Sequence, residues 1–113
     1  MKSKCSLMLV FAAALAAAGR RPIPWEKDHL RAGQMLYREN CVVCHDIDRP
    51  KSNKPGPSFY QLFKRDKMPI ASMKPNRDYI KVRVRFGGQL MPAFRQWLSE
   101  AEIDTLIDYI ASK

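Results

Sequence analysis

The stretch Cys41-Val42-Val43-Cys44-His45 carries the most specific signal in this 113-residue chain. Two thiols three residues apart lie on adjacent positions of one helical turn, and His45 follows four residues after Cys41. Both sulfurs can therefore reach the vinyl groups on one side of a porphyrin and form thioethers, while the imidazole turns beneath the same ring. A Cys-x-x-Cys-His run is the attachment pattern of a c-type haem. It predicts one covalently bound haem c whose iron is ligated by His45.

Two other kinds of site also use a Cys-x-x-Cys pair. A tetrahedral zinc site needs four ligands, and outside this motif the chain after residue 18 offers only His29 as a further Cys or His. A redox dithiol of the thioredoxin type belongs near a βαβ pattern, and no such pattern is visible. Both alternatives fit the sequence less well than a haem does.

The chain resembles a small class I cytochrome c of bacterial type, a single-haem electron carrier, from about residue 26 to residue 112. The attachment motif and the stretch Gly87-Gly88-Gln89-Leu90-Met91-Pro92 carry this resemblance. The resemblance implies an all-α cytochrome c fold, with about three to five helices wrapped around one covalently bound haem. It also implies one-electron transfer between redox partners, so no catalytic residue is expected.

The first 18 residues have the pattern of a secretory signal peptide. Lys2 and Lys4 precede an apolar run of twelve residues, and Ala16-Ala17-Ala18 suits cleavage near Ala18. Spanning a bilayer takes about twenty residues, so an uncleaved anchor is the less favoured alternative. We expect an exported, periplasmic protein with no stable membrane insertion. The third cysteine, Cys5, would leave with the leader.

The charge of the mature chain limits the classes of partner. Loss of Lys2 and Lys4 would leave 18 basic against 11 acidic side chains, a net charge of +7, which two haem propionates would reduce to about +5. Basic chains of this size often bind nucleic acid, but an exported protein rarely meets it, so no nucleic-acid partner is expected. The length after the leader predicts one domain, and we expect a monomer.

The chain from residue 19 to residue 58 is predicted to contain a tether, a helix and a loop. Residues 19–25 contain Pro22 and Pro24, which favour an extended tether, and residues 26–113 form the cytochrome c domain. The first helix is expected to begin near Glu26 or Asp28, where acidic groups suit a helix start, and to end near Asn40. Residues 46–58 lack periodicity and contain Pro and Gly, which predicts a loop.

The second half of the chain contains two further helices and one ambiguous pattern. Apolar residues alternate with basic ones from residue 80 to residue 86, as in a strand. No partner strand is available, and Asn76 and Gly87 suit the two ends of a helix, so we predict a helix. A shorter helix is expected over residues 59–63, with Phe59, Leu62 and Phe63 walling the haem pocket. Ser99 and Glu102 form a capping box that begins the last helix.

The resemblance assigns roles to residues outside the attachment motif. In the family the first and last helices cross closely, with a glycine on the first and aromatic side chains on both, and Gly33, Tyr37 and Tyr109 match this pattern. A proline-flanked carbonyl in the family accepts a hydrogen bond from the axial histidine, and Pro57 matches that position. His29 is interpreted as a surface histidine rather than a haem ligand.

A second axial ligand would distinguish a carrier from a catalyst, because iron with one open position can bind gases or peroxide. Met35, Met68, Met73 and Met91 are the candidates after the leader. Met35 is too close in sequence to the attachment motif to reach the opposite face of a haem. Met91 lies between two glycines and Pro92, where the family places its axial methionine, so it is favoured over Met68. An open-site haem enzyme or gas sensor, and a relay subunit of a dehydrogenase or oxidase complex, remain as alternatives.

The basic residues are distributed unevenly, which predicts the chemistry of the partner. The segment from Arg49 to Arg85 contains eleven basic residues, whereas the last helix is acidic. We therefore expect redox partner proteins with acidic docking surfaces, although a merely solvated basic surface is the alternative.

Overall fold

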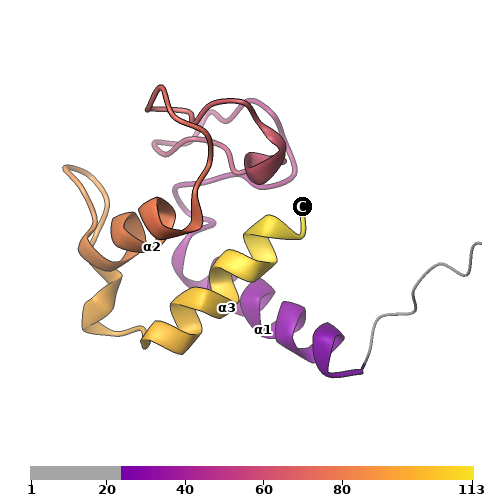
Figure 1. Cartoon of the computed structure of the whole chain (residues 1–113). Helices are drawn as coiled ribbons and strands as arrows, with labels where there is room; N and C mark the ends of the chain where they lie inside the picture. Colours follow the sequence, from indigo (N-terminus) through magenta and orange to yellow (C-terminus); the bar gives the residue numbers. More distant parts are fainter. Residues whose placement is uncertain (1–23) are drawn as a thin grey trace, which may run out of the picture.

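Residues 24–113 fold as three helices joined by long loops (Figure 1). A computed structural model describes residues 24–113, so the predicted leader and most of the predicted tether lie outside the described residues. The helices are α1 (Pro24–Asn40), α2 (Arg77–Phe86) and α3 (Glu100–Ala111), with short 3-10 helices η1 (Leu62–Lys64) and η2 (Phe94–Gln96). Within residues 24–113 the only β pairing is an isolated bridge between Met68 and Ala71. The all-α prediction is confirmed.

Helix α1 begins earlier than predicted. It begins at Pro24 rather than at Glu26 or Asp28. Residues 24 and 25 therefore belong to the helix, and the prediction that they end an extended tether was wrong. Proline is tolerated at the first helical position, because its fixed φ suits a helix and its missing N–H would have had no intrahelical partner. The predicted end at Asn40 is confirmed.

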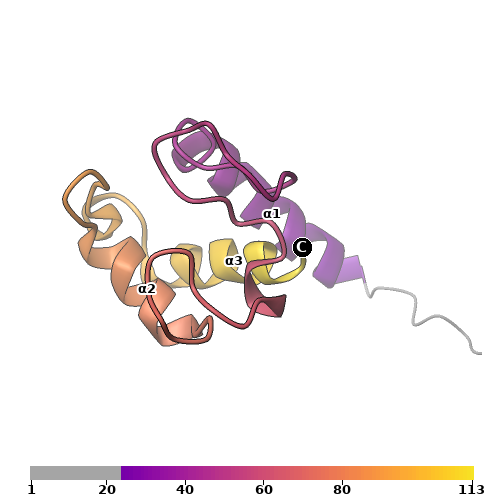
Figure 2. The same ribbon diagram turned by 90° about the horizontal axis from the view of Figure 1, so that it is seen from above.

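The crossing of α1 and α3 forms the base of the molecule (Figures 1 and 2). Gly33 lies at the crossing, where a Cβ built on it would be 2.5 Å from Tyr109 Cβ and 2.6 Å from the Thr105 carbonyl oxygen. Tyr37 and Tyr109 pack beside this point with ring centroids 6.0 Å apart. The predicted close crossing, with glycine on one helix and aromatic residues on both, is confirmed.

The segment in which apolar and basic residues alternate, residues 80–86, belongs to helix α2, as predicted. Asn76 accepts hydrogen bonds from the N–H groups of Asp78 and Tyr79, and Gly87 ends the helix with φ 70°. Ile80 and Val84, four residues apart, are buried, whereas Val82 and Phe86 are about half exposed, at 52% and 49%. The strand-like pattern therefore arose because α2 carries apolar side chains on its exposed face as well as its buried one.

Helix α3 is held at its start by the predicted capping box, and it is almost entirely buried along one face. The Ser99 side chain accepts from the Glu102 N–H, and Glu102 accepts from the Ser99 N–H. Ile103, Leu106 and Ile107 are the most deeply buried side chains described. A cap of this kind typically contributes about 1 kcal/mol.

The acidic groups of α3 form ion pairs with basic groups of α2, which the sequence pattern did not reveal. Lys81 lies 2.8 Å from Asp104, and Arg85 lies 2.7 Å from Glu100. Asp108 accepts from His29 of α1 at 2.8 Å and pairs with Arg77 at 2.7 Å. His29 is therefore a partly exposed histidine that joins α1 to α3.

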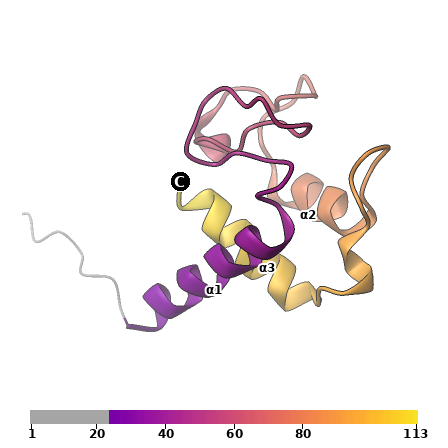
Figure 3. The ribbon, with the colours of Figure 1, turned by 180° about the vertical axis from the view of Figure 1, so that it is seen from behind.

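The long connection from α1 to α2 lies on one side of the α1–α3 pair, with α2 beside α3 (Figure 3). The predicted short helix is present as η1, but it is a 3-10 turn over residues 62–64 and excludes Phe59. A backbone N–H of Leu62 donates to the Phe59 carbonyl, so residues 59–61 form only the turn that leads into it. Among residues 24–113, no helix is long and apolar enough to cross a membrane.

Gly33→Ala should lower the free energy of unfolding by about 1–3 kcal/mol, the usual cost of overpacking a close contact. The added methyl would meet a backbone oxygen, which cannot swing aside as a side chain can. Denaturant unfolding of the purified protein measures this change. Alanine exceeds glycine in helix propensity by about 1 kcal/mol, so a stabilised variant would show that α1 and α3 do not touch at this point.

Candidate functional site

The attachment motif forms a turn that continues directly from the end of α1. The backbone N–H of Cys41 donates to the Tyr37 carbonyl at 2.8 Å, and the N–H groups of Cys44 and His45 donate to the Cys41 carbonyl at 3.1 and 2.9 Å. These bonds keep residues 41–45 in helix-like geometry beyond α1. Neither cysteine forms a disulfide.

Both thiols and the imidazole line a single cavity of about 510 Å³. This volume lies within the range of about 300–1,000 Å³ that is usual for cofactor sites. The walls are mainly apolar and come from every part of the described fold: Cys41, Cys44 and His45 from the attachment turn, Phe59 and Leu62 near η1, Ile80 and Val84 from α2, Phe94 from η2, and Leu106 and Ile110 from α3. The cavity is thus closed by residues distant in sequence.

His45 is held in one orientation. Its Nδ1 lies 2.7 Å from the Pro57 carbonyl oxygen, and its ring stacks on Phe59 with centroids 4.2 Å apart. A carbonyl can only accept, so Nδ1 carries the proton and Nε2 keeps a lone pair. Burial lowers the pKa of His45, against the opposing effect of the Pro57 hydrogen bond, and the nearby Lys54 ammonium lowers it further. The neutral imidazole needed for binding iron is therefore favoured.

Gly56 allows the loop to approach this imidazole closely. A Cβ on Gly56 would lie 2.6 Å from His45 Nδ1 and 2.7 Å from the Cys44 carbonyl oxygen. The Gly56 N–H also donates to that carbonyl at 2.7 Å. Any side chain at position 56 would push the loop away from His45 and break the hydrogen bond to Pro57.

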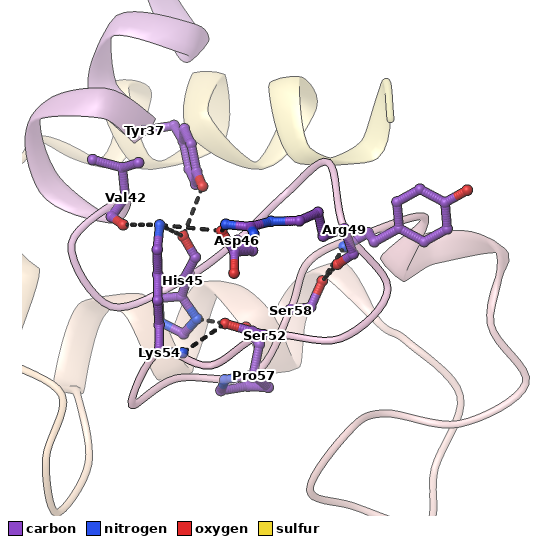
Figure 4. Close-up of polar contacts among 10 residues, drawn as sticks. Tyr37, Val42, His45, Asp46, Arg49, Ser52, Lys54, Pro57 and Ser58 are labelled. Atoms are coloured by element: carbon purple, nitrogen blue, oxygen red, sulfur yellow. Dashed lines mark hydrogen bonds and ion pairs between the residues drawn. The ribbon is translucent and has the colours of Figure 1, made fainter.

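Polar groups that are not part of the cavity lining secure the backbone of the attachment turn (Figure 4). The Tyr37 hydroxyl donates to the His45 carbonyl at 2.8 Å. Burial, with the nearby Asp46 carboxylate, raises the pKa of Tyr37 to about 12, so the hydroxyl remains a donor at all ordinary pH values. The Lys54 ammonium donates to the Val42 and His45 carbonyls at 2.6 and 3.2 Å.

Asp46 follows the imidazole directly and is buried, with 7% of its surface exposed. Its Oδ1 lies 3.2 Å from Lys54 Nζ and 3.3 Å from an Arg49 guanidinium nitrogen. A hydrogen bond from Ser52, followed by the contacts with Lys54 and Arg49, lowers the pKa of Asp46 below its ordinary value. Asp46 is therefore a carboxylate at neutral pH.

Two of the four candidate methionines line the cavity. Met91 and Met68 are among the lining residues and are partly buried against the core. Met35 and Met73 are outside the lining and are 52% and 45% exposed. The geometry thus reduces four candidates to two.

Glycines shape the loop that carries Met91. Gly87 adopts the left-handed φ of 70°, and the Gly88 N–H donates to the Met91 carbonyl at 2.9 Å. Met68 lies in a different loop, where its N–H donates to the Met73 carbonyl at 2.7 Å. The two methionines therefore reach the cavity from separate segments.

The donor set suits a flat, largely apolar group that contains a metal. The cavity offers two thiols for covalent attachment, one oriented imidazole and one or two thioethers, surrounded by apolar walls. Burial raises the pKa of the Cys41 thiol to about 12, so this group is a neutral thiol in the folded chain. Within residues 24–113, no three His, Cys, Asp or Glu side chains are grouped so as to hold a bare metal ion.

The site residues predicted from the sequence, which are the attachment motif, Pro57 and Met91, contribute to the lining of one cavity, but sequence reasoning missed several other residues around it. Phe63 was expected in the pocket wall, yet it is not among the lining residues. Lys54 was not singled out, because its role depends on the path of a loop without periodicity. Ile80 and Val84 lie four residues apart, and this helical spacing was the feature of the sequence that could have indicated that α2 lines the cavity.

Of three comparisons with known proteins, one gives a match. Residues 28–110 match the family model described as cytochrome c oxidase, cbb3-type, subunit III. A search of curated proteins produced no significant match, and a search of solved structures produced none either. The matched range includes every residue that lines the cavity.

Proposed function

Because the chain belongs to the cbb3-type cytochrome c oxidase subunit III family, whose cytochrome c domain carries covalently bound haem c with iron, we propose that it is an exported single-haem electron carrier. Haem c supplies a reversible one-electron change of valence at iron. The observation that supports the proposal most directly is the convergence of two thiols, an imidazole and a thioether on one apolar cavity. No bond-making step is assigned to the chain.

In this proposal Cys41 and Cys44 form the two thioethers and His45 is the proximal ligand. Nδ1 of His45 donates to the Pro57 carbonyl, which leaves the Nε2 lone pair free, so Nε2 is the atom that would bind iron. Phe59 stacks on the ring and Gly56 gives the loop room to reach it. The protein thus fixes the tautomer, orientation and protonation state of the imidazole.

We assign Met91 as the distal ligand. Its loop is bent by Gly87, is closed by a hydrogen bond from Gly88 and is followed by Pro92, which holds the methionine in extended geometry. A thioether in this position favours reduced iron and raises the potential relative to a second imidazole. Met68 lines the same cavity and is the alternative ligand.

A relay subunit within an oxidase is the second candidate function, because the matched family is described as an oxidase subunit. A free carrier and a fixed relay need the same haem site, so the cavity supports both equally. Gel filtration of a native extract separates them. A free carrier elutes at the size of the mature monomer, whereas a relay elutes with a larger assembly.

The proposed location is the periplasm, after cleavage near Ala18. c-type cytochromes are generally exported, and the pattern of residues 1–18 is that of a secretory signal. N-terminal sequencing of the mature protein tests this assignment directly.

The docking surface is proposed to be the basic loop beside the cavity. Several basic groups of the segment 49–85 are neutralised by the ion pairs of α2 with α3 and of Lys54 with Asp46. Lys64, Lys67 and Lys74 have no ion pair among the described residues and are exposed. Lys64 is the last residue of η1, and Lys67 and Lys74 lie in the loop that follows it and that contributes Met68, Pro69 and Ile70 to the cavity wall. The structure thus restricts the positive surface to fewer residues than the sequence suggested.

Covalent attachment is the first test of the proposed function. The colour of the wild-type protein should remain with the polypeptide through denaturation and acid–acetone extraction, because thioethers survive both treatments. The variant with Cys41 and Cys44 both changed to alanine should lose its haem under the same conditions. Free extraction of haem from the wild type would refute the proposal.

Met91→Ala should lower the reduction potential, abolish the sulfur-to-iron charge-transfer band of the oxidised protein and allow carbon monoxide to bind. Met68→Ala is the matched control, since it removes a thioether from the same cavity, and it should leave all three properties unchanged. Optical spectra and redox titration measure them. The reverse pattern would make Met68 the ligand.

Added salt should slow the bimolecular reaction with the redox partner, because the screening length falls from about 8 Å at 0.15 M to about 3 Å at 1 M. Lys64→Glu combined with Lys67→Glu should flatten this dependence, measured by stopped-flow kinetics. Lys27→Glu with Arg31→Glu makes the same charge change on exposed positions of α1 and should leave the slope largely intact. Equal effects of the two pairs would mean that docking is not directed to the loop beside the cavity.

A further inference from the structure

We propose that Lys54 is a positioning residue for the haem-attachment turn and that its ammonium group raises the reduction potential of the iron. The inference rests on the proposed function, since it takes His45 as the proximal ligand. Lys54 is not among the residues that line the cavity, and its hydrogen bonds go to backbone carbonyls, so it acts through the backbone and through its charge.

All three donors of the Lys54 ammonium have an oxygen within reach. Nζ lies 2.6 Å from the Val42 carbonyl, 3.2 Å from the His45 carbonyl and 3.2 Å from Asp46 Oδ1 (Figure 4). An ammonium group has three N–H donors and no acceptor. The Lys54 side chain is 28% exposed, so it is largely removed from solvent. This is a specific contact set rather than a solvated surface lysine.

The two carbonyls lie in the turn just beyond the end of α1, and neither accepts a hydrogen bond from a backbone N–H among residues 24–113. A cation near a helix C-terminus is also favoured by the helix dipole. The Tyr37 hydroxyl donates to the same His45 carbonyl at 2.8 Å. The backbone that carries the imidazole is therefore held from α1 by Tyr37 and from the loop by Lys54.

The charge of Lys54 balances a buried anion beside the proximal ligand. Asp46 is 7% exposed, and its other cationic neighbour, Arg49, has a side chain that is 70% exposed. Removal of the Lys54 ammonium would leave the carboxylate without its less exposed partner. Oxidised iron carries one more positive charge than reduced iron, so the added net negative charge would stabilise the oxidised form and lower the potential.

Lys51 provides a matched control in the same loop. It is exposed and has no hydrogen bond or ion pair among residues 24–113. A charge in solvent is screened within about 8–10 Å at ordinary ionic strength. Lys51→Met and Lys54→Met therefore make the same change in net charge, one at a screened position and one at an enclosed position.

The experiment compares the reduction potentials and thermal midpoints of the two haem-loaded variants. Lys54→Met should shift the potential downward by more than Lys51→Met does, and should also lower the thermal midpoint, with the charge-transfer band retained. Adding Asp46→Asn to Lys54→Met should reverse most of the downward shift, because it removes the uncompensated anion. Equal potentials for the two single variants would overturn the inference.

Further outcomes distinguish a failure of this inference from a failure of the proposed function. A wild-type protein without covalent haem or without the charge-transfer band refutes the proposed function itself, whereas a normal wild type with equal single variants refutes only the role of Lys54. If Lys54→Met fails to accumulate with haem, Lys54→Arg decides the matter. Restored loading at the wild-type potential supports a positioning cation, and failed loading with arginine contradicts it.

Discussion

The contact between α1 and α3 at Gly33 is the constraint on which the other parts of the structure depend. The glycine lets the Thr105 carbonyl and the Tyr109 side chain approach the α1 backbone more closely than any other residue would allow. This contact sets the angle of α1, whose end carries the attachment turn, and of α3, whose Leu106 and Ile110 form part of the cavity wall. The positions of both thiols and of His45 therefore follow from how two helices pack some distance from them.

Many residues of the hydrophobic core also line the cofactor cavity. Leu62, Ile80, Val84, Phe94, Leu106 and Ile110 are all buried core residues, and all line the cavity. A domain of this size buries a relatively small share of its surface on its own. Since the same side chains form the core and line the cavity, a haem in the cavity would add apolar contacts that the chain makes only when it is folded.

The features that local sequence determines were predictable, and those that depend on the path of a loop were not. Asn76, Ser99 with Glu102, and the attachment motif act within a few residues of their own position, so their patterns can be read from the sequence. Pro24 was misassigned because proline is excluded from helix interiors but not from a first position. Lys54 lies in a segment without periodicity, and the partners of the α3 carboxylates lie on other helices. Nothing in the local sequence reports such contacts.

The separation in sequence between Gly33 and Tyr109 also determines the order in which the chain can assemble. A chain is made from its amino end, so α1 and the two cysteines exist before α3 does. This close packing contact must wait until α3 has been made, because it joins the first and last helices of the described fold. Until then the wall formed by Leu106 and Ile110 is missing and the thiols stay accessible. The placement of the last helix thus leaves an interval in which an attachment apparatus can reach the cysteines before the core closes over them.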